Sequence, residues 1–430
     1  MRSRFAPRSF AHALGALAAA LLLPPGAGAD DTAPQISIDH KGFRARTADG
    51  QFAFKLGGRL HADGTLHIGD TPGDTPTTNR GVTDGTEVRR GRLSAEIQAY
   101  EDWHWMGEVD FADNNTAIKD FFLSYEGLEG VKLTVGHQKQ PYSLAIEMSS
   151  NDIPFTERSI DYDAIVPIVD RAIGVRADAN GEHWFLAAGF YGDSVEPGDR
   201  NTAEGFGTAA RFIFSPIISP ERVLHLGFRG AYRKPEVGNE GLQFRDETTH
   251  MSDYRILSTG TIQDIDDVVL FGPEAAFACG PFSIFGEYNR QVIMRDRGNT
   301  LQFEGGHIGA TWTLTGESRA AAYRIDSGEF KRLTPKQNFS LKNGGIGAWE
   351  LAGRYAYQNL NDGSASDPSS IEGGREQVLT FALNWYVNPV VRFMLNYNYV
   401  LQADSSGTNA VVAKEGEGLN SFTMRAQVTF

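Results

Sequence analysis

The chain ends with the stretch NSFTMRAQVTF, residues 420–430. In this stretch the apolar residues Phe422, Met424, Ala426, Val428 and Phe430 alternate strictly with threonine, arginine and glutamine. In a transmembrane barrel the outer face of each strand meets hydrocarbon and the inner face meets water, so alternation over about ten residues is expected. The stretch therefore predicts a barrel strand that faces lipid on one side and closes on an aromatic residue.

The opposite end of the chain has the pattern of an export signal. Three arginines within the first eight residues precede an apolar run at residues 10–23, which is followed by two prolines and an Ala-Gly-Ala triplet. This order predicts a secretory signal peptide over residues 1–29, cleaved before Asp30. We expect a short N-terminal leader over residues 30–49 and a single barrel domain over residues 50–430.

Composition excludes several classes of protein. The 40 Lys and Arg residues are outnumbered by 54 Asp and Glu residues, which gives a formal net charge of −14 and argues against a nucleic-acid partner. The single cysteine, Cys279, has no partner for an intramolecular disulfide. No histidine pair has the spacing of a metal site, and no motif implies a cofactor, so we expect neither.

After the predicted signal peptide no run of about 18 apolar residues occurs, which excludes a helical membrane anchor and leaves a closed barrel as the only way to span a bilayer. The mean hydropathy of −0.32 fits this, because half of each strand would face an aqueous lumen. The alternative is a secreted β-sandwich, which the length and number of the strands disfavour.

Sixteen segments show strand alternation, and short turns between them alternate with long connections. We therefore predict an all-β, transmembrane antiparallel β-barrel of about 16 strands, with short turns on the periplasmic side and long loops outside. The long connections are predicted at residues 69–87, 139–170, 234–267, 315–345 and 403–419. The strands are predicted near residues 52–66, 90–99, 103–111, 117–125, 131–138, 172–178, 184–191, 206–214, 223–233, 269–279, 282–291, 306–314, 347–358, 377–386, 391–401 and 420–430.

Aromatic residues near strand ends or on the outward phase are predicted to form interfacial girdles, although a sandwich core would use them too. They are Trp103, Trp105, Trp184, Trp312, Trp349, Trp385, Tyr386, Tyr397 and Tyr399.

The inward phase of the strands predicts the function. A 16-stranded barrel is too wide for side chains to fill, so it leaves an aqueous channel for passive permeation. The inward face carries more basic than acidic residues, which favours a weak preference for anions. The alternative for any one residue is an ion pair that cross-links the wall. The candidate pore-lining basic residues are Arg59, Arg90, Arg92, Lys132, Arg211, Arg229, Arg354, Arg392 and Arg425.

The connection at residues 139–170 is the candidate constriction loop. It is rich in carboxylates, and if it folds into the lumen it would narrow the pore and oppose the basic wall; the alternative is an external loop. The residues assigned to the constriction are Lys139, Glu147, Asp152, Glu157 and Arg158.

Five motifs in order resemble the phosphate-selective porin O/P family over essentially the whole mature chain. They are DGQFAFKLGGRLHAD at residues 49–63, VGHQKQPYSLAIEMSSNDIPFTER at 135–158, LTGESR at 314–319, GAWELAGR at 347–354 and NWYVNP at 384–389.

This resemblance implies a homotrimeric outer-membrane porin of a Gram-negative bacterium, whose third loop folds inward. It also implies a ladder of arginines, with Arg59, Arg90 and Arg92 as candidates. The sequence departs from the phosphate-selective members at residues 143–150, where Ile146 and Glu147 stand in place of a lysine. A carboxylate there would repel an oxyanion.

The expected function is passive diffusion of small hydrophilic solutes across the outer-membrane lipid bilayer, with weak anion selectivity and phosphate as a candidate solute. We do not expect an enzyme. One alternative is a barrel-based hydrolase, for which His61, His104 and His225 are available inward but no Gly-x-Ser-x-Gly elbow occurs. The other is a structural or adhesive protein that works through its long acidic loops.

Overall fold

The structure is a computed structural model that describes residues 33–68, 83–192, 203–236, 241–246, 249–251, 255–363, 369–404 and 420–430. The predicted signal peptide lies outside the described residues. None of the helices in these ranges is long and apolar enough to cross a membrane.

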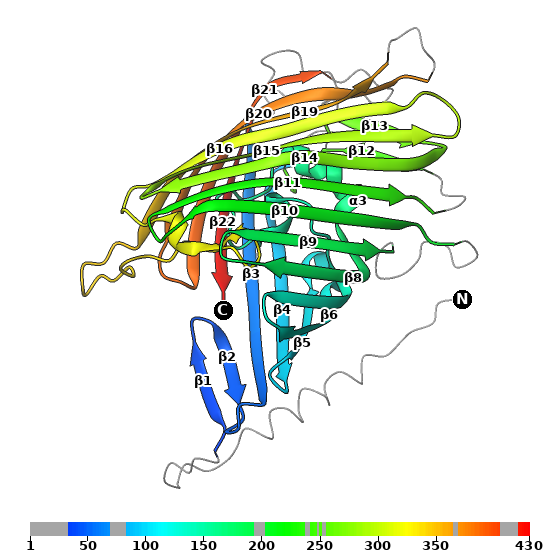
Figure 1. The fold of residues 1–430 in the computed structure, drawn as a ribbon. Helices are drawn as coiled ribbons and strands as arrows, with labels where there is room; N and C mark the ends of the chain where they lie inside the picture. Colours follow the sequence, from blue (N-terminus) through cyan, green and yellow to red (C-terminus); the bar gives the residue numbers. More distant parts are fainter. Residues whose placement is uncertain are drawn as a thin grey trace, which may run out of the picture.

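Sixteen antiparallel strands close into a barrel (Figure 1), as the sequence predicts. Each strand pairs with its neighbour in the chain, and the last strand, β22, pairs with the first barrel strand, β3, with Arg425 opposite Asp63. The barrel strands are β3 (Phe52–Ile68), β4 (Gly85–Ala99), β5 (Trp103–Asp110), β6 (Ala117–Leu128), β7 (Val131–Lys139), β8 (Arg171–Asn180), β9 (Trp184–Tyr191), β10 (Phe206–Ile218), β11 (Arg222–Lys234), β14 (Ile265–Cys279), β15 (Phe282–Arg295), β16 (Leu301–Thr313), β19 (Ala348–Asp362), β20 (Ile371–Tyr386), β21 (Val391–Asp404) and β22 (Asn420–Thr429).

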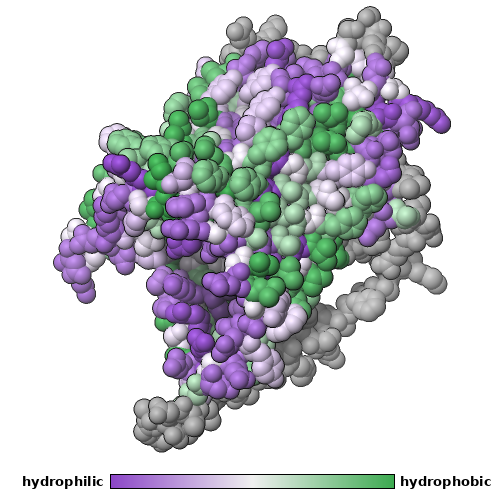
Figure 2. All heavy atoms as spheres, viewed as in Figure 1, coloured by the Kyte–Doolittle hydropathy of each residue, from purple (hydrophilic) through white to green (hydrophobic). Residues whose placement is uncertain are grey.

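The alternation in the sequence becomes an apolar outer wall and a polar inner one. On β10 the outward side chains of Phe212 and Phe214 are 47% and 46% exposed, whereas the inward side chain of Arg211 on the same strand is fully buried. Figure 2 shows broad hydrophobic patches over the middle of the visible wall and hydrophilic residues towards its ends. This is the surface that a bilayer requires of a barrel. Tyr386 departs from the predicted girdle, because it is buried inside and its hydroxyl donates to Glu350.

Part of the predicted leader forms a hairpin of strands β1 (Gln35–Asp39) and β2 (Gly42–Arg46). Strand β2 pairs with the beginning of β3, with Phe43 opposite Leu56, so the hairpin extends the sheet beyond one end of the barrel (Figure 1, blue). The end of β22 meets the same region, where Gly58 exchanges two backbone hydrogen bonds with Phe430.

The loop of residues 140–170 folds into the lumen, as predicted for the constriction loop. It contains α2 (Leu144–Glu147) and α3 (Ile160–Val169), whereas the short 3-10 helix η1 (Ala112–Asn114) belongs to the connection between β5 and β6. Helix α3 packs against the hairpin of β12 (Leu242–Arg245) and β13 (Ser258–Ile262) from the loop between β11 and β14. The buried residues of α3 lie on one side of the helix, but the sequence shows no clear amphipathic pattern, because the buried side includes Asp161 and the opposite side includes the apolar residues Val166 and Pro167.

One predicted connection lies at the wrong end of the barrel. The sequence predicts residues 315–345 to form an external loop because of their length, and in the structure this connection spans residues 314–347, between β16 and β19. Strand direction reverses at every turn, and twelve strands precede this segment, so it emerges at the end that carries the short turns. That end faces the periplasm in bacterial barrels. The segment contains η2 (Arg319–Ala322), β17 (Tyr323–Arg324) and β18 (Glu329–Phe330).

This periplasmic segment also enters the lumen. Its Tyr323 and Phe330 pack with Leu144 and Met148 of the loop 140–170, so chain from both ends of the barrel meets inside it. Arg319 holds the segment to the wall through two hydrogen bonds to Glu350, at 2.6 and 2.8 Å. The lumen is therefore largely filled, and the open space is confined to one side.

Candidate permeation pathway

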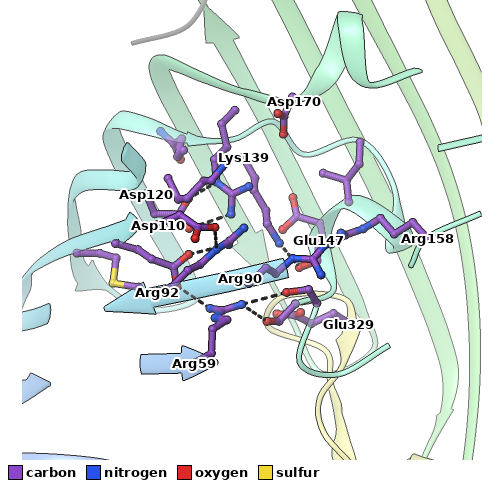
Figure 3. Close-up of a pocket in the computed structure, with 18 of the residues that line it drawn as sticks. Arg59, Arg90, Arg92, Asp110, Asp120, Lys139, Glu147, Arg158, Asp170 and Glu329 are labelled. Carbon is purple, nitrogen blue, oxygen red and sulfur yellow. Dashed lines mark hydrogen bonds and ion pairs between the residues drawn. The ribbon is translucent and has the colours of Figure 1, made fainter. Parts of the chain in front are cut away.

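A cavity of about 810 Å³ lies between the wall of strands β3–β8 and the inward-folded loops (Figure 3). Loop 140–170 forms one side of it, and residues 326–331 of the periplasmic segment contribute at its edge. Eleven Lys and Arg residues and ten Asp and Glu residues line it, so it is densely charged and close to neutral. The basic residues of the lining are Arg59, Arg89, Arg90, Arg92, Lys119, Lys132, Lys139, Arg158, Arg171, Arg176 and Lys331.

Arg59 and Arg92 share one carboxylate. Arg59 Nη2 lies 2.6 Å from one Glu108 oxygen, and Arg92 Nη1 lies 2.9 Å from the other. Arg92 also donates from Nε to Asp110 at 2.7 Å. These pairs lie side by side on adjacent strands, because Arg59 is opposite Arg92 in the register of β3 and β4. The wall here combines two fixed cations with two fixed anions.

A second carboxylate, Glu157 of the loop 140–170, receives Arg89, Arg90 and Arg425. Arg89 and Arg90 each donate two hydrogen bonds to the Glu157 carboxylate, at 3.0 to 3.2 Å. Arg425 Nη2 lies 2.7 Å from Glu157 Oε1. Two neighbours on a strand normally face opposite sides. The register between β3 and β4 shifts at His61, opposite Arg90, so a bulge turns Arg89 inward as well.

The cations around Glu157 control its ionisation. Burial opposes the charged form, but Arg89, Arg90 and Arg425 outweigh it and hold the pKa of the Glu157 carboxyl well below its ordinary value. Glu157 therefore carries its charge throughout the physiological range. It ties the loop 140–170 to strands from both sides of the barrel closure.

A second irregularity brings Lys119 and Asp120 to the cavity together. The outward residues Ile118 and Phe121 are 41% and 51% exposed, and the register between β5 and β6 shifts in this region. Asp120 accepts two hydrogen bonds from Arg171, at 2.9 and 3.0 Å. Lys119 forms no ion pair with a carboxylate in the part of the chain that the structure describes. Strict alternation could not have indicated either Lys119 or Arg89.

Glu147 of the loop 140–170 is neutralised by the wall. Arg176 donates to it from Nη1 at 2.9 Å and to Asp178 from Nε at 2.6 Å. The repulsion of anions that the sequence predicts from Glu147 is thereby reduced, because its charge is paired with a guanidinium group.

The side chains of Lys139 and Arg158 both donate hydrogen bonds to backbone carbonyl oxygens of the segment around α2. Lys139 Nζ donates to the carbonyl oxygens of Glu147 at 2.8 Å and Met148 at 3.5 Å, and Arg158 donates to those of Ala145 and Met148, at 2.5 and 2.8 Å. Neither side chain forms an ion pair with a carboxylate among the described residues. Two positive charges at the cavity thus rest on neutral acceptors.

The remaining predicted pore-lining arginines do not line this cavity. They hold the inward-folded segments to the wall by donating to backbone carbonyl oxygens: Arg211 to Gly328 at 2.7 Å, Arg354 to Glu157 at 3.2 Å and Arg392 to Ile153 at 2.9 Å. Arg229 pairs with Glu274 and Glu287, and Arg425 pairs with Asp63, in both cases with a fully buried guanidinium group. Lys132 is half-exposed in the cavity wall and pairs with Glu126 at 2.8 Å.

Asp152, a predicted member of the constriction, is buried behind the cavity rather than in its lining. Burial raises the pKa of its carboxyl.

The inward histidines considered for a hydrolase take structural positions. His61 is fully buried, with Nε2 2.9 Å from the Asn151 side-chain oxygen. His225, also fully buried, lies between Tyr323 and Glu274. His104 is partly exposed and 3.8 Å from Glu126. In the described ranges no group of three or more His, Cys, Asp or Glu side chains is placed to hold a metal ion.

A closed 16-stranded barrel with an apolar outer wall, inward-folded loops and an eccentric charged cavity defines a membrane channel of the porin class. The sequence matches the family described as phosphate-selective porin O and P over residues 54–430, and the chain belongs to this family. It is an outer-membrane porin, and its family relatives are channels rather than enzymes.

Individual relatives agree with this assignment. Porin O of Pseudomonas aeruginosa is 27% identical over 456 residues, which cover 97% of this chain and 99% of that protein. An uncharacterised protein of Caulobacter vibrioides is 29% identical over 81% of this chain and 68% of its own length. The solved structure of an anion-selective porin from Comamonas acidovorans shares the fold, with a TM-score of 0.55, 12% identity and coverage of 88% of this chain and 100% of that one.

Proposed function

We propose that this porin passes small hydrophilic solutes by passive diffusion, with a weak preference for anions. The observation that carries the proposal is the meeting of Lys139 and Arg158 at the Met148 carbonyl oxygen, where two cations line the cavity and pair with no carboxylate of the described residues.

Electrostatics supports the preference. Two like charges near each other repel, and the low-dielectric protein around a narrow passage focuses their field. An anion that enters this space relieves the repulsion, whereas a cation adds to it. Lys119, on the neighbouring wall, contributes a third positive charge that pairs with no carboxylate in the described part of the chain. Because the lining as a whole carries eleven basic and ten acidic residues, the preference should be weak.

Phosphate is the candidate solute that the family suggests. Guanidinium groups bind its oxygens in bidentate fashion, and a lysine ammonium can replace part of its hydration shell. In this chain the positions at residues 143–150 supply no lysine, but Lys139 extends from the end of β7 to the carbonyl oxygen of Glu147 and brings an ammonium to the same place.

Planar-bilayer recording tests both levels of the proposal. In a KCl gradient the reversal potential should show chloride favoured over potassium, and equal or cation-favouring permeability would overturn the anion preference. Phosphate added at low millimolar concentration should reduce the chloride current. If chloride is favoured and phosphate has no effect, the anion preference stands and the phosphate proposal fails.

We further propose a homotrimer and removal of residues 1–29 on export. A trimeric form is described for the outer membrane protein OmpT of Vibrio cholerae, whose fold matches with a TM-score of 0.51 at 12% identity. Light scattering with subtraction of the detergent mass should give three chains, and a monomer would refute the assembly. N-terminal sequencing of protein from outer membranes should begin at Asp30, and an intact Met1 would refute the cleavage.

The two alternative functions have direct tests. A hydrolase should cleave lipid or ester substrates in purified form, and we expect none to be cleaved while the protein conducts ions. An adhesive protein should depend on the long loop between β11 and β14. In the structure the described part of that loop packs against α3 inside the barrel, which favours a role in shaping the pore.

A further inference from the structure

The periplasmic segment 314–347 does more than fill the lumen, because its last part returns over the rim to the outside of the barrel. Residues 339–346, the rim hairpin, are fastened there by a backbone bond from Phe339 N–H to the Val387 carbonyl oxygen at 2.8 Å, and the hairpin is closed on itself by a bond from Ser340 to Gly345 at 2.9 Å. Phe339 lies edge-on against Trp385, with ring centroids 5.2 Å apart.

Trp385 belongs to the lipid-facing wall. It is in phase on β20 with Phe381, which is 52% exposed, and it stacks between Trp349 of β19 and Phe393 of β21 at centroid distances of 5.3 and 5.8 Å. Phe282 and Trp312 stack in the same way on the neighbouring strands β15 and β16. This is an aromatic girdle at the short-turn end, the kind of belt that sits at the headgroup level of a membrane.

The rim hairpin is continuous with this girdle. The indole N–H groups of both Trp349 and Trp385 donate to the carbonyl oxygen of Ile346, at 3.2 and 2.9 Å. Beyond these contacts the hairpin presents apolar side chains without cover: Leu341 is 90% exposed and Ile346 is 58% exposed. A leucine this exposed at a protein surface beside a membrane belt indicates contact with lipid rather than with water.

The charged residues within the sequence of the hairpin and its flanks are of one sign, although Glu317 accepts a hydrogen bond from the Lys336 backbone N–H at 3.0 Å. From residue 330 to residue 349 the sequence contains no Asp or Glu but four basic residues, Lys331, Arg332, Lys336 and Lys342. Lys342 directly follows Leu341, and both Lys336 and Lys342 are exposed. Lysines that flank inserted apolar side chains interact with anionic phospholipid headgroups.

We propose that residues 339–346 are a phospholipid-binding site at the periplasmic leaflet of the outer membrane. Leu341 and Ile346 enter the acyl-chain region next to the girdle, while Lys336 and Lys342 contact headgroup phosphates and favour anionic lipids. The same segment continues into the lumen through Phe330 and Tyr323, so lipid binding at the rim also fixes the chain that occupies the pore.

Spin labelling measures the depth of the hairpin directly. In a Cys279→Ser background, a nitroxide on Leu341→Cys should be more accessible to oxygen than to a water-soluble nickel chelate in vesicles of phosphatidylethanolamine and phosphatidylglycerol. Phe381→Cys on the outer wall provides the lipid reference, and Lys41→Cys in the turn between β1 and β2 provides the water reference. A label at residue 341 that behaves like the one at residue 41 would overturn the proposal.

The choice of lipid is tested by the lysines. Native mass spectrometry of the protein in detergent with phosphatidylglycerol should show lipid binding that falls about fivefold for each lysine removed in Lys336→Gln and Lys342→Gln. The matched control, Lys41→Gln, should leave binding unchanged. Equal binding by wild type and the double variant would refute the headgroup contact. If the label at residue 341 is immobilised equally in detergent and in vesicles, the hairpin packs against a second copy of the chain and the lipid site is refuted.

Discussion

Lys139 and Arg158 donate to the same carbonyl oxygen, that of Met148, at 3.5 and 2.8 Å. One side chain comes from the end of a barrel strand and the other from the loop that folds into the lumen. Their convergence places two positive charges at the cavity, and neither forms an ion pair among the described residues. The sequence assigned both residues to the constriction, but only the fold shows that they share an acceptor.

Neutralising Glu147 should strengthen the anion preference. In Glu147→Gln the Arg176 guanidinium keeps Asp178 but loses its second carboxylate, so the cavity gains one net positive charge. We expect the reversal potential in a KCl gradient to move further towards that of chloride. The matched control is Glu182→Gln, a 90% exposed side chain in the turn between β8 and β9. A shift towards potassium in Glu147→Gln would contradict the assignment of this region.

Removing Arg319 should release the periplasmic segment from the wall. In Arg319→Ala the buried Glu350 carboxylate keeps only its hydrogen bonds from the Tyr386 hydroxyl and the Asn384 amide. Breaking a buried ion pair in this way lowers the free energy of unfolding by about 3–5 kcal/mol. We expect a lower urea midpoint in detergent and a larger, noisier single-channel conductance. Arg319→Leu with Glu350→Leu should recover most of the stability, because no buried charge is left unpaired. Equal conductance in wild type and Arg319→Ala would place the segment outside the pathway.

The stability of the loop 140–170 should depend on pH through Glu157. Its pKa is lowered in the folded protein, so the charged form contributes stability in full above the unfolded pKa of about 4.5, and the contribution is lost as pH falls through the lower folded value. The difference in unfolding free energy between wild type and Glu157→Gln should therefore be constant from neutral pH to about pH 5 and shrink below that. A difference that grows on acidification would have the wrong sign.

Gly272 of β14 should tolerate no side chain. A Cβ at this position would lie 1.7 Å from the carbonyl oxygen of Tyr288 on the adjacent strand, whereas at Gly230 of β11 the nearest atom is 3.7 Å away. We expect the free energy of unfolding of Gly272→Ala to fall by at least about 1–3 kcal/mol, or the variant to fail to fold, whereas Gly230→Ala should fold normally. The heat-dependent shift of the folded barrel on electrophoresis measures both. Equal behaviour of the two variants would contradict the strand pairing.

Most of the barrel can be predicted from the alternation of apolar and polar residues within each strand. All sixteen predicted strands occur, because a wall between lipid and water forces a period of two on every one of them. Arg89 and Lys119 were missed since both sit at irregularities in the strand register, which no single-strand pattern reveals. The periplasmic placement of residues 314–347 follows from counting strand reversals, and length alone misled the prediction.

The inward phase identified cations but not their partners. Arg211, Arg354 and Arg392 have the spacing of pore-lining residues, yet they bind backbone carbonyls of chain that enters the lumen from distant segments. Tyr386 has the position of a girdle residue but turns inward to Glu350. Such contacts depend on how loops fill the barrel, which is a tertiary property that the strand sequences do not contain.

The most direct test of the account compares wild type with the double variant Lys139→Gln and Arg158→Gln in planar bilayers under a KCl gradient. Wild type should favour chloride, and the variant should move the reversal potential towards zero or towards potassium while Lys41→Gln leaves it unchanged. A double variant that keeps the wild-type reversal potential would show that the paired cations at Met148 do not set the selectivity of this porin.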